Sequence, residues 1–160
     1  ADLNNFKSFN DKYGFLRGDQ AIKLAAQCIL SAVEAGGGEG PSFVGHIGGD
    51  DFVLVAHPDR VQKICDDIIG RFDSMIPNLY DESDRRQGHI MAKNRQGQVV
   101  QTPLMGIAMV IVNSHDREFE HPGEISSLAS ELKTYAKSFG KSVHVTERRK
   151  PPEERPPTTL

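Results

Sequence analysis

The sequence predicts an α/β (α+β) fold in a ferredoxin-like pattern, with a central, mostly antiparallel sheet and flanking helices. Segments with helical spacing alternate with short β-branched segments in the order helix, hairpin, helix, hairpin, strand, helix, strand. The 160 residues match one ordinary domain, and 38% apolar residues together with 15 glycines are enough for a packed core. We therefore expect a single domain over residues 1–147.

Apolar residues at helical spacing predict three helices. The first begins near Gly18 and ends before the glycines at 36–38, and the second runs from about Pro58 to Pro77. The third runs from about Glu124 to Phe139, and Gly140 ends it. In this last helix we expect these residues to face the core: Ile125, Leu128, Ala129, Leu132, Tyr135 and Ala136.

Short β-branched and aromatic segments predict the strands. Residues 42–47 and 51–56 flank the tetrapeptide Gly48-Gly49-Asp50-Asp51, whose composition suits a tight hairpin turn. Residues 89–94 and 98–102 flank a second turn signal at 95–97. Residues 104–112 are apolar enough for a strand covered on both faces, and 142–146 predict a short last strand.

The two ends of the sequence differ from the rest. A strand is expected immediately before Asp2, yet the sequence begins one residue earlier, so we interpret the chain as a piece of a longer protein. Residues 148–160 contain four prolines and no apolar residue before the last, which predicts a flexible, extended tail.

Charge and hydropathy exclude several classes of function. With 19 basic and 22 acidic residues, a net charge of -3 and a pI near 6.1, the chain has no general attraction to nucleic acid, and an RNA-binding sheet is disfavoured. No apolar run reaches the ~20 residues of a membrane span, and no export signal begins the chain, so we expect no membrane contact by this segment. Cys28 and Cys65 lie on apolar helix faces, typical of reduced thiols, and favour a cytoplasmic location.

Polar residues gather in the segment 2–19, DLNNFKSFNDKYGFLRGD. Asp2, Asn10, Asp11 and Asp19 could cap the following helix and shape turns. They could also form a nucleotide pocket, with an early carboxylate for a metal ion and backbone N–H groups at residues 5–7 for phosphates. The residues alone leave both interpretations open.

Two further clusters have the same ambiguity. Asp50 and Asp51 are adjacent carboxylates at a hairpin tip, where a divalent cation such as Mg²⁺ would relieve their repulsion, although an exposed acidic turn is also possible. Lys137 and Lys141 are four residues apart at a helix end. They could complement the helix dipole or hold a triphosphate.

Taken together, the segment 2–19, the sequence HIGGDDF and the later AKSFGK resemble the GGDEF domain, the family of diguanylate cyclases. The resemblance covers nearly the whole chain. It implies a nucleotidyl-cyclase type of fold whose N-terminal helix and most of whose first strand are missing from this sequence. It also implies condensation of two GTP molecules into cyclic di-GMP with release of pyrophosphate, in bacterial second-messenger signalling, with Mg²⁺ or Mn²⁺ as cofactor.

The resemblance assigns roles residue by residue. Metal binding falls to Asp2, Leu3 and Asp50, and catalysis to Asp50 and Asp51. Asn10 and Asp19 match the positions that read the guanine edge, which suits a carboxylate that accepts from the guanine N–H groups. The other substrate-binding positions are Asn5, Phe6, Lys7, Lys137 and Lys141.

Three positions depart from the family pattern. Asp51 replaces a glutamate, Asn4 replaces an aspartate and Phe15 replaces a histidine. A carboxylate drawn back by about 1 Å can reduce a rate about 10²-fold, so turnover is expected to be low. The alternative is an impaired domain that binds GTP and regulates an attached domain such as a cyclic di-GMP phosphodiesterase. The resemblance also implies that catalysis needs a homodimer, and that a sensor or EAL-type domain is attached in the full-length protein.

Overall fold

The computed structural model describes residues 1–36, 42–93, 96–114 and 119–148. The helices are α1 (Phe6–Tyr13), α2 (Phe15–Ala35), α3 (Pro58–Met75), the 3₁₀ turn η1 (Ile76–Leu79), α4 (Glu82–Gln87) and α5 (Pro122–Ser138). The strands are β1 (Asp2–Leu3), β2 (Phe43–Gly48), β3 (Asp51–Val55), β4 (His89–Lys93), β5 (Val99–Pro103), β6 (Ile107–Ile111) and β7 (Val143–Thr146).

Short β1 joins the pieces of the central sheet. On one side β1 pairs antiparallel with β6, with Asp2 opposite Ala108, and β6 pairs parallel with β7. On the other side the Ala1 nitrogen donates to the Phe52 oxygen at 2.8 Å, and the Phe52 nitrogen donates to the Ala1 oxygen at 2.9 Å. This exchange is an antiparallel hydrogen-bonded pair, so the two-stranded β2–β3 sheet lies beside β1, at the edge of the three-stranded sheet of order β1-β6-β7. The β4–β5 hairpin stands apart.

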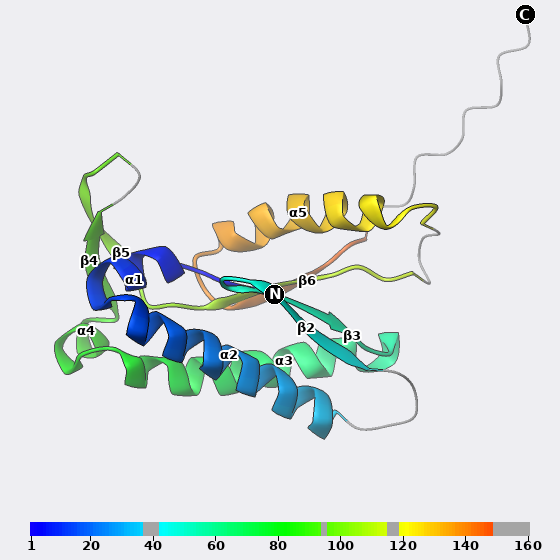
Figure 1. Ribbon diagram of the computed structural model, residues 1–160, viewed down its shortest axis with the longest axis horizontal. Helices are drawn as coiled ribbons and strands as arrows, with labels where there is room; N and C mark the ends of the chain where they lie inside the picture. Colours follow the sequence, from blue (N-terminus) through cyan, green and yellow to red (C-terminus); the bar gives the residue numbers. More distant parts are fainter. Residues whose placement is uncertain (37–41, 94–95, 115–118, 149–160) are drawn as a thin grey trace, which may run out of the picture.

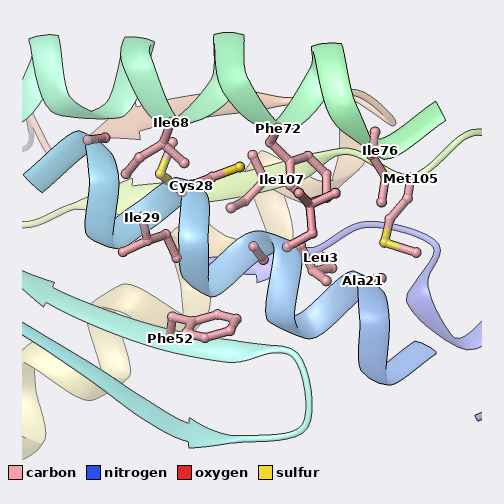
Figure 2. Packing of buried hydrophobic residues seen from close by; sticks show 14 of the residues in the cluster. Leu3, Ala21, Cys28, Ile29, Phe52, Ile68, Phe72, Ile76, Met105 and Ile107 are labelled. Carbon is pink, nitrogen blue, oxygen red and sulfur yellow. The ribbon is translucent and has the colours of Figure 1, made fainter. Parts of the chain in front are cut away.

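Helices cover both faces of this sheet (Figure 1), with α2 and α3 on one face and α5 on the other. Figure 2 shows the hydrophobic core between the sheet and α3, which contains Leu3 and Ile107 from the sheet and Phe72 and Ile68 from α3. All four side chains are at most 1% exposed. The predicted α/β class with a mostly antiparallel sheet is confirmed.

The three predicted helices and both predicted hairpins are confirmed, with different boundaries. The first predicted helix begins at Phe15 rather than near Gly18, and the strand expected over residues 104–112 covers only Ile107–Ile111. The first hairpin turn is shorter than expected, because Gly48 already belongs to β2 and Asp51 to β3, which leaves Gly49 and Asp50 in the turn. Helices α1 and α4 lie where no helix was predicted.

Two residues expected in the core are exposed. Ile125 is 40% exposed and Tyr135 is 55% exposed, because α5 buries only the stripe that contains Leu128 and Ala136 against the sheet. Cys28 and Cys65 are buried free thiols, as predicted. The predicted tail lies outside the described residues apart from Arg148, and the domain boundary at 147 stays a prediction. Within the described ranges, no helix has the length and apolar character needed to cross a bilayer.

A buried carboxylate fixes the small helix α4 beneath α1. The Lys12 ammonium lies 2.5 Å from Asp84 Oδ2, the Tyr13 hydroxyl donates to the same oxygen, and Asp84 is 8% exposed. These hydrogen bonds from Lys12 and Tyr13 hold the pKa of Asp84 below its ordinary value. The contact therefore stabilises the fold more when Asp84 is ionised than when it is protonated.

This contact predicts acid sensitivity. Because the folded-state pKa of Asp84 is depressed, its stabilisation is complete above the unfolded pKa of about 3.9 and is lost as pH falls through the folded value. Asp84→Asn should lower the free energy of unfolding at pH 7 by about 1–3 kcal/mol and flatten its decline below pH 4, measured by urea titration. Asp67→Asn, which removes an exposed ion pair with Arg71, is the control and should change stability by at most about 0.5 kcal/mol. Identical pH slopes for wild type and Asp84→Asn would contradict the prediction.

Candidate functional site

The strand register places two carboxylates side by side. Since Ala1 and Phe52 form a hydrogen-bonded pair, the next residues, Asp2 and Asp51, lie directly opposite each other on one face of the sheet. Leu3 and Phe52 point to the other face, where both are buried in the core (Figure 2). Asp2 is only 3% exposed. The sheet therefore presents an acid pair to the face that α5 covers.

Two lysines of α5 meet this acid pair. Lys133 Nζ lies 2.6 Å from Asp2 Oδ2 and also pairs with Asp51 Oδ1, whereas Lys137 pairs with Asp2 Oδ1. The two lysines are four residues apart and therefore share one face of the helix. One ammonium group thus touches both carboxylates, so Asp2 and Asp51 are close enough to share a cation.

The electrostatic environment shifts the pKa values of the two hairpin carboxylates in opposite directions. Burial, together with the negative charge of Asp2, raises the pKa of Asp50 above its ordinary value. Burial also acts to raise the pKa of Asp51, but the hydrogen bond and charge of Lys133 outweigh it and lower that pKa. Burial acts to lower the pKa of Lys133, and its bonds to Asp2 and Asp51 raise it instead. The charge of Asp2 therefore reaches Asp50, whereas Lys133 sets the direction of the shift at Asp51.

The hairpin tip leaves room beside these acids. Gly49 has φ +56°, a left-handed conformation that favours glycine. A Cβ atom built at Gly48 or Gly49 would meet no atom within 4 Å. The backbone of the tip is therefore open to the approach of a ligand.

The oxygen atoms available at this site are of the kind that binds a hard divalent cation. Carboxylate oxygens of Asp2 and Asp50 and a backbone carbonyl at Leu3 are the oxygen ligands that Mg²⁺ prefers. The Asp2 Oδ1 atom is buried and pairs with the Lys137 ammonium, so a metal ion at this oxygen would take the place of that contact. Within the part of the chain that the structure describes, no group of three or more His, Cys, Asp or Glu side chains is placed to hold a metal ion. A metal centre here would therefore rest on two carboxylates and main-chain or substrate oxygens.

The predicted phosphate-binding segment forms the first turn of α1. Asn5 precedes the helix with φ 62°, and no side chain caps the helix, so the first backbone N–H groups receive no side-chain acceptor. Phe6 packs against the core, and Lys7 is exposed and pairs with Asp11. Such a helix start favours an anion in its vicinity.

The two predicted guanine-reading residues lie at the contact between α1 and α2. Asn10 Oδ1 is buried without a hydrogen-bond partner and lies so close to Gly18 that a Cβ there would be 1.8 Å away. Asp19, the residue after Gly18 in α2, is exposed. Gly18 therefore makes space for the Asn10 amide, which keeps an acceptor available.

Asn4 has a structural role that the sequence did not reveal. Its backbone nitrogen donates to the Gly106 oxygen at 2.8 Å, and its side-chain Nδ2 donates to the Lys141 carbonyl at 3.0 Å. An aspartate could not donate to that carbonyl. Asn4 therefore ties β1 to the segment that carries Lys141, whose own side chain is exposed.

The structure brings Asp2 and Asp51 together with Lys137, and adds Lys133, which the sequence analysis missed. Asp50 lies in the hairpin turn, where the charges of Asp2 and Lys137 act on it. The sequence feature that could have revealed Lys133 is its spacing, because Lys133, Lys137 and Lys141 follow one another at intervals of four residues. That spacing defines a helix face, but it does not say which strands the face covers.

An acid pair on two neighbouring strands and a glycine-rich hairpin tip, under a helix that carries two lysines, define an α/β domain with a candidate nucleotide site. The family model described as "Diguanylate cyclase, GGDEF domain" matches residues 1–117. The chain belongs to the GGDEF family, whose domain is associated with cyclic di-GMP signalling.

Curated relatives are similar to parts of the chain. An uncharacterized signaling protein of Caulobacter vibrioides is 43% identical over 90 residues, which is 54% of this chain and 10% of that protein. Signaling protein YkoW of Bacillus subtilis is 39% identical over 54 residues, 34% of this chain and 6% of its own. The cyclic di-GMP phosphodiesterase PdeR of Escherichia coli is 40% identical over 55 residues, 34% of this chain and 8% of its own. The chain thus spans a tenth or less of each relative.

Among solved structures, the GGDEF domain of DgcB from Caulobacter crescentus, in complex with c-di-GMP, is similar with a TM-score of 0.49. The sequence identity is 20%, and the match covers 91% of this chain and 73% of that one.

Proposed function

We propose that this domain binds GTP and condenses two GTP molecules into cyclic di-GMP with release of pyrophosphate. The observation that carries the proposal is the meeting of Asp2 and Asp51 at a single ammonium group on the face beneath α5. Carboxylates that converge on one cation are what a magnesium-dependent nucleotidyl transfer requires. Family membership supports the choice of nucleotide and product.

In this proposal Asp2, Asp50 and the Leu3 carbonyl hold Mg²⁺ or Mn²⁺. When bound, the ion neutralises triphosphate oxygens and favours the ionised 3′-hydroxyl. The N–H groups of residues 5–7 bind phosphate oxygens. Lys137 and Lys141 add positive charge, and Asp51 lies beside the reacting groups.

Guanine recognition falls to Asn10 and Asp19. The unpartnered Oδ1 of Asn10 is an acceptor that can take a guanine N–H, and the Asp19 carboxylate accepts the remaining donors. Adenine lacks this donor pair, so the site should select GTP over ATP.

One domain provides one such site, so the reaction needs two copies that face each other, and an attached sensor or EAL-type domain would bring them together. The test fuses the chain to a dimerising partner and supplies GTP with Mg²⁺. We expect cyclic di-GMP by mass spectrometry, which ATP does not replace. Absence of the product from a folded, dimeric fusion would refute the cyclase proposal.

The second candidate is a GTP-binding module that regulates an attached domain without turnover. Asp51 in place of glutamate favours it, and so does the relative PdeR, a phosphodiesterase. Saturable GTP binding by calorimetry, with no product from the dimeric fusion, would select this candidate. Neither binding nor product would exclude both.

The tight contact at Gly18 predicts a change in nucleotide affinity. Gly18→Ala places a methyl group where the Asn10 amide lies, so this side chain must move away. The dissociation constant for GTP should rise about tenfold or more, the loss expected for one recognition hydrogen bond to a buried group. Gly70→Ala on α3, where a Cβ meets nothing within 4 Å, is the matched control and should leave GTP affinity unchanged. Equal calorimetric affinities for Gly18→Ala and wild type would show that Asn10 does not bind the base.

A further inference from the structure

We propose that Lys133 is a built-in counter-cation that competes with the divalent metal ion for Asp2 and Asp51, so that metal binding requires its displacement. This inference rests on the proposed function, which places the metal ion on Asp2, and it assumes that an ion bound there also lies beside Asp51. It adds a regulatory contact to that site and assigns a role to a residue outside the predicted set.

Position is the first argument. The Lys133 ammonium contacts an oxygen of each carboxylate of the cross-strand pair, which is where a shared cation would lie. Lys137 approaches Asp2 from its other oxygen and does not contact Asp51 in any ion pair described here. Of the two lysines, Lys133 is therefore the one that takes the shared position.

Charge balance is the second argument. Two carboxylates directly opposite each other in neighbouring strands repel, and Asp2 is 3% exposed, so water screens it poorly. An ammonium between them removes the repulsion without a metal. A divalent ion at the same place would meet both the carboxylates and the positive charge of Lys133, so one of the two cations must leave.

Access is the third argument. The Lys133 side chain is 31% exposed and the Asp51 side chain is 41% exposed, so the ammonium can swing to solvent from its four-carbon stem. Lys133 therefore acts as a replaceable occupant that keeps the acid pair aligned until the metal arrives.

The test measures Mn²⁺ binding to the dimeric fusion without nucleotide, by electron paramagnetic resonance of the free ion. Lys133→Met keeps the length of the side chain and removes its charge. We expect Mn²⁺ to bind Lys133→Met about tenfold or more tightly than wild type. Lys133→Arg, which keeps the charge, should bind as weakly as wild type. Lys23→Met, an exposed lysine of α2, controls for the overall loss of one positive charge.

Thermal unfolding gives a second measurement. Lys133→Met should melt at a lower temperature than wild type without metal, and Mn²⁺ should raise its melting temperature more than that of wild type. Equal Mn²⁺ affinities for wild type and Lys133→Met would overturn the role of Lys133 and leave the metal site intact. If neither protein binds Mn²⁺ at millimolar concentration, the metal site itself is wrong and the inference falls with it.

Discussion

Asp2→Asn should reduce cyclic di-GMP formation by the dimeric fusion about 10³-fold. The change removes one negative charge from the acid pair and one oxygen ligand of the proposed metal, while the amide keeps the size of the side chain. Losing a preorganised electrostatic group at a reacting centre commonly reduces turnover by 10²–10³, and loss of the metal adds to this. The measurement is initial rate by mass spectrometry at saturating GTP and Mg²⁺.

Stability must be measured beside the rate, since Asp2 also balances Lys133 and Lys137. Both lysine side chains are about a third or more exposed, at 31% and 41%, so the unpaired ammonium groups can turn toward water. We therefore expect a folded protein with a modest loss of about 1–2 kcal/mol. Asp66→Asn on α3, which removes an exposed carboxylate paired with His144, should keep the wild-type rate. An Asp2→Asn rate within threefold of wild type would remove Asp2 from the mechanism.

Asp51→Glu should raise the rate of the same fusion about 10²-fold. One added methylene moves the carboxylate about 1 Å further from β3, and displacements of that size change rates by about this factor when groups react at short range. Asp51 is already held by Lys133 and 41% of its side chain is exposed, so a longer side chain has space to extend. The readout is cyclic di-GMP per domain over time at fixed dimer concentration.

The neighbouring position supplies a matched control. Asp50→Glu adds the same methylene one residue earlier, at a predicted metal ligand, and should lower the rate or leave it unchanged. Asp51→Glu without any gain in rate would mean that the shorter side chain does not limit catalysis. The second candidate, a GTP-binding module without turnover, would then lose the support that it takes from Asp51.

Sequence patterns were most informative where many residues act together. The apolar stripe from Val61 to Met75 and the β-branched segments around Gly49 predicted α3 and the first hairpin, because burial of a whole face fixes their period. Helix α1 escaped prediction because it has eight residues, starts after a left-handed Asn5 and lacks a side-chain cap. The six-residue helix α4 depends on tertiary contacts through Asp84.

The candidate site was partly predictable for a related reason. Motif resemblance selected Asp2, Asp51 and Lys137, which do gather on one side of the sheet, and it selected Asp50 in the hairpin turn, which their charges reach. Their alignment follows from a single backbone pair between β1 and β3, which no local pattern encodes. Lys133 escaped because helical spacing reveals which residues share a face, whereas the strand beneath that face is set by tertiary packing.

That backbone pair has a mechanical consequence. If β3 slipped past β1 by one residue, Phe52 would take the place of Asp51. The Asp51 carboxylate would then point into the hydrophobic core, and the Phe52 ring would point toward two lysines. Loss of phenylalanine burial alone would cost about 2–3 kcal/mol, and an unpaired buried carboxylate several more. The register of β3 against β1 is therefore fixed. A movement of the β2–β3 hairpin must move Asp2 and Asp51 together, as one rigid unit.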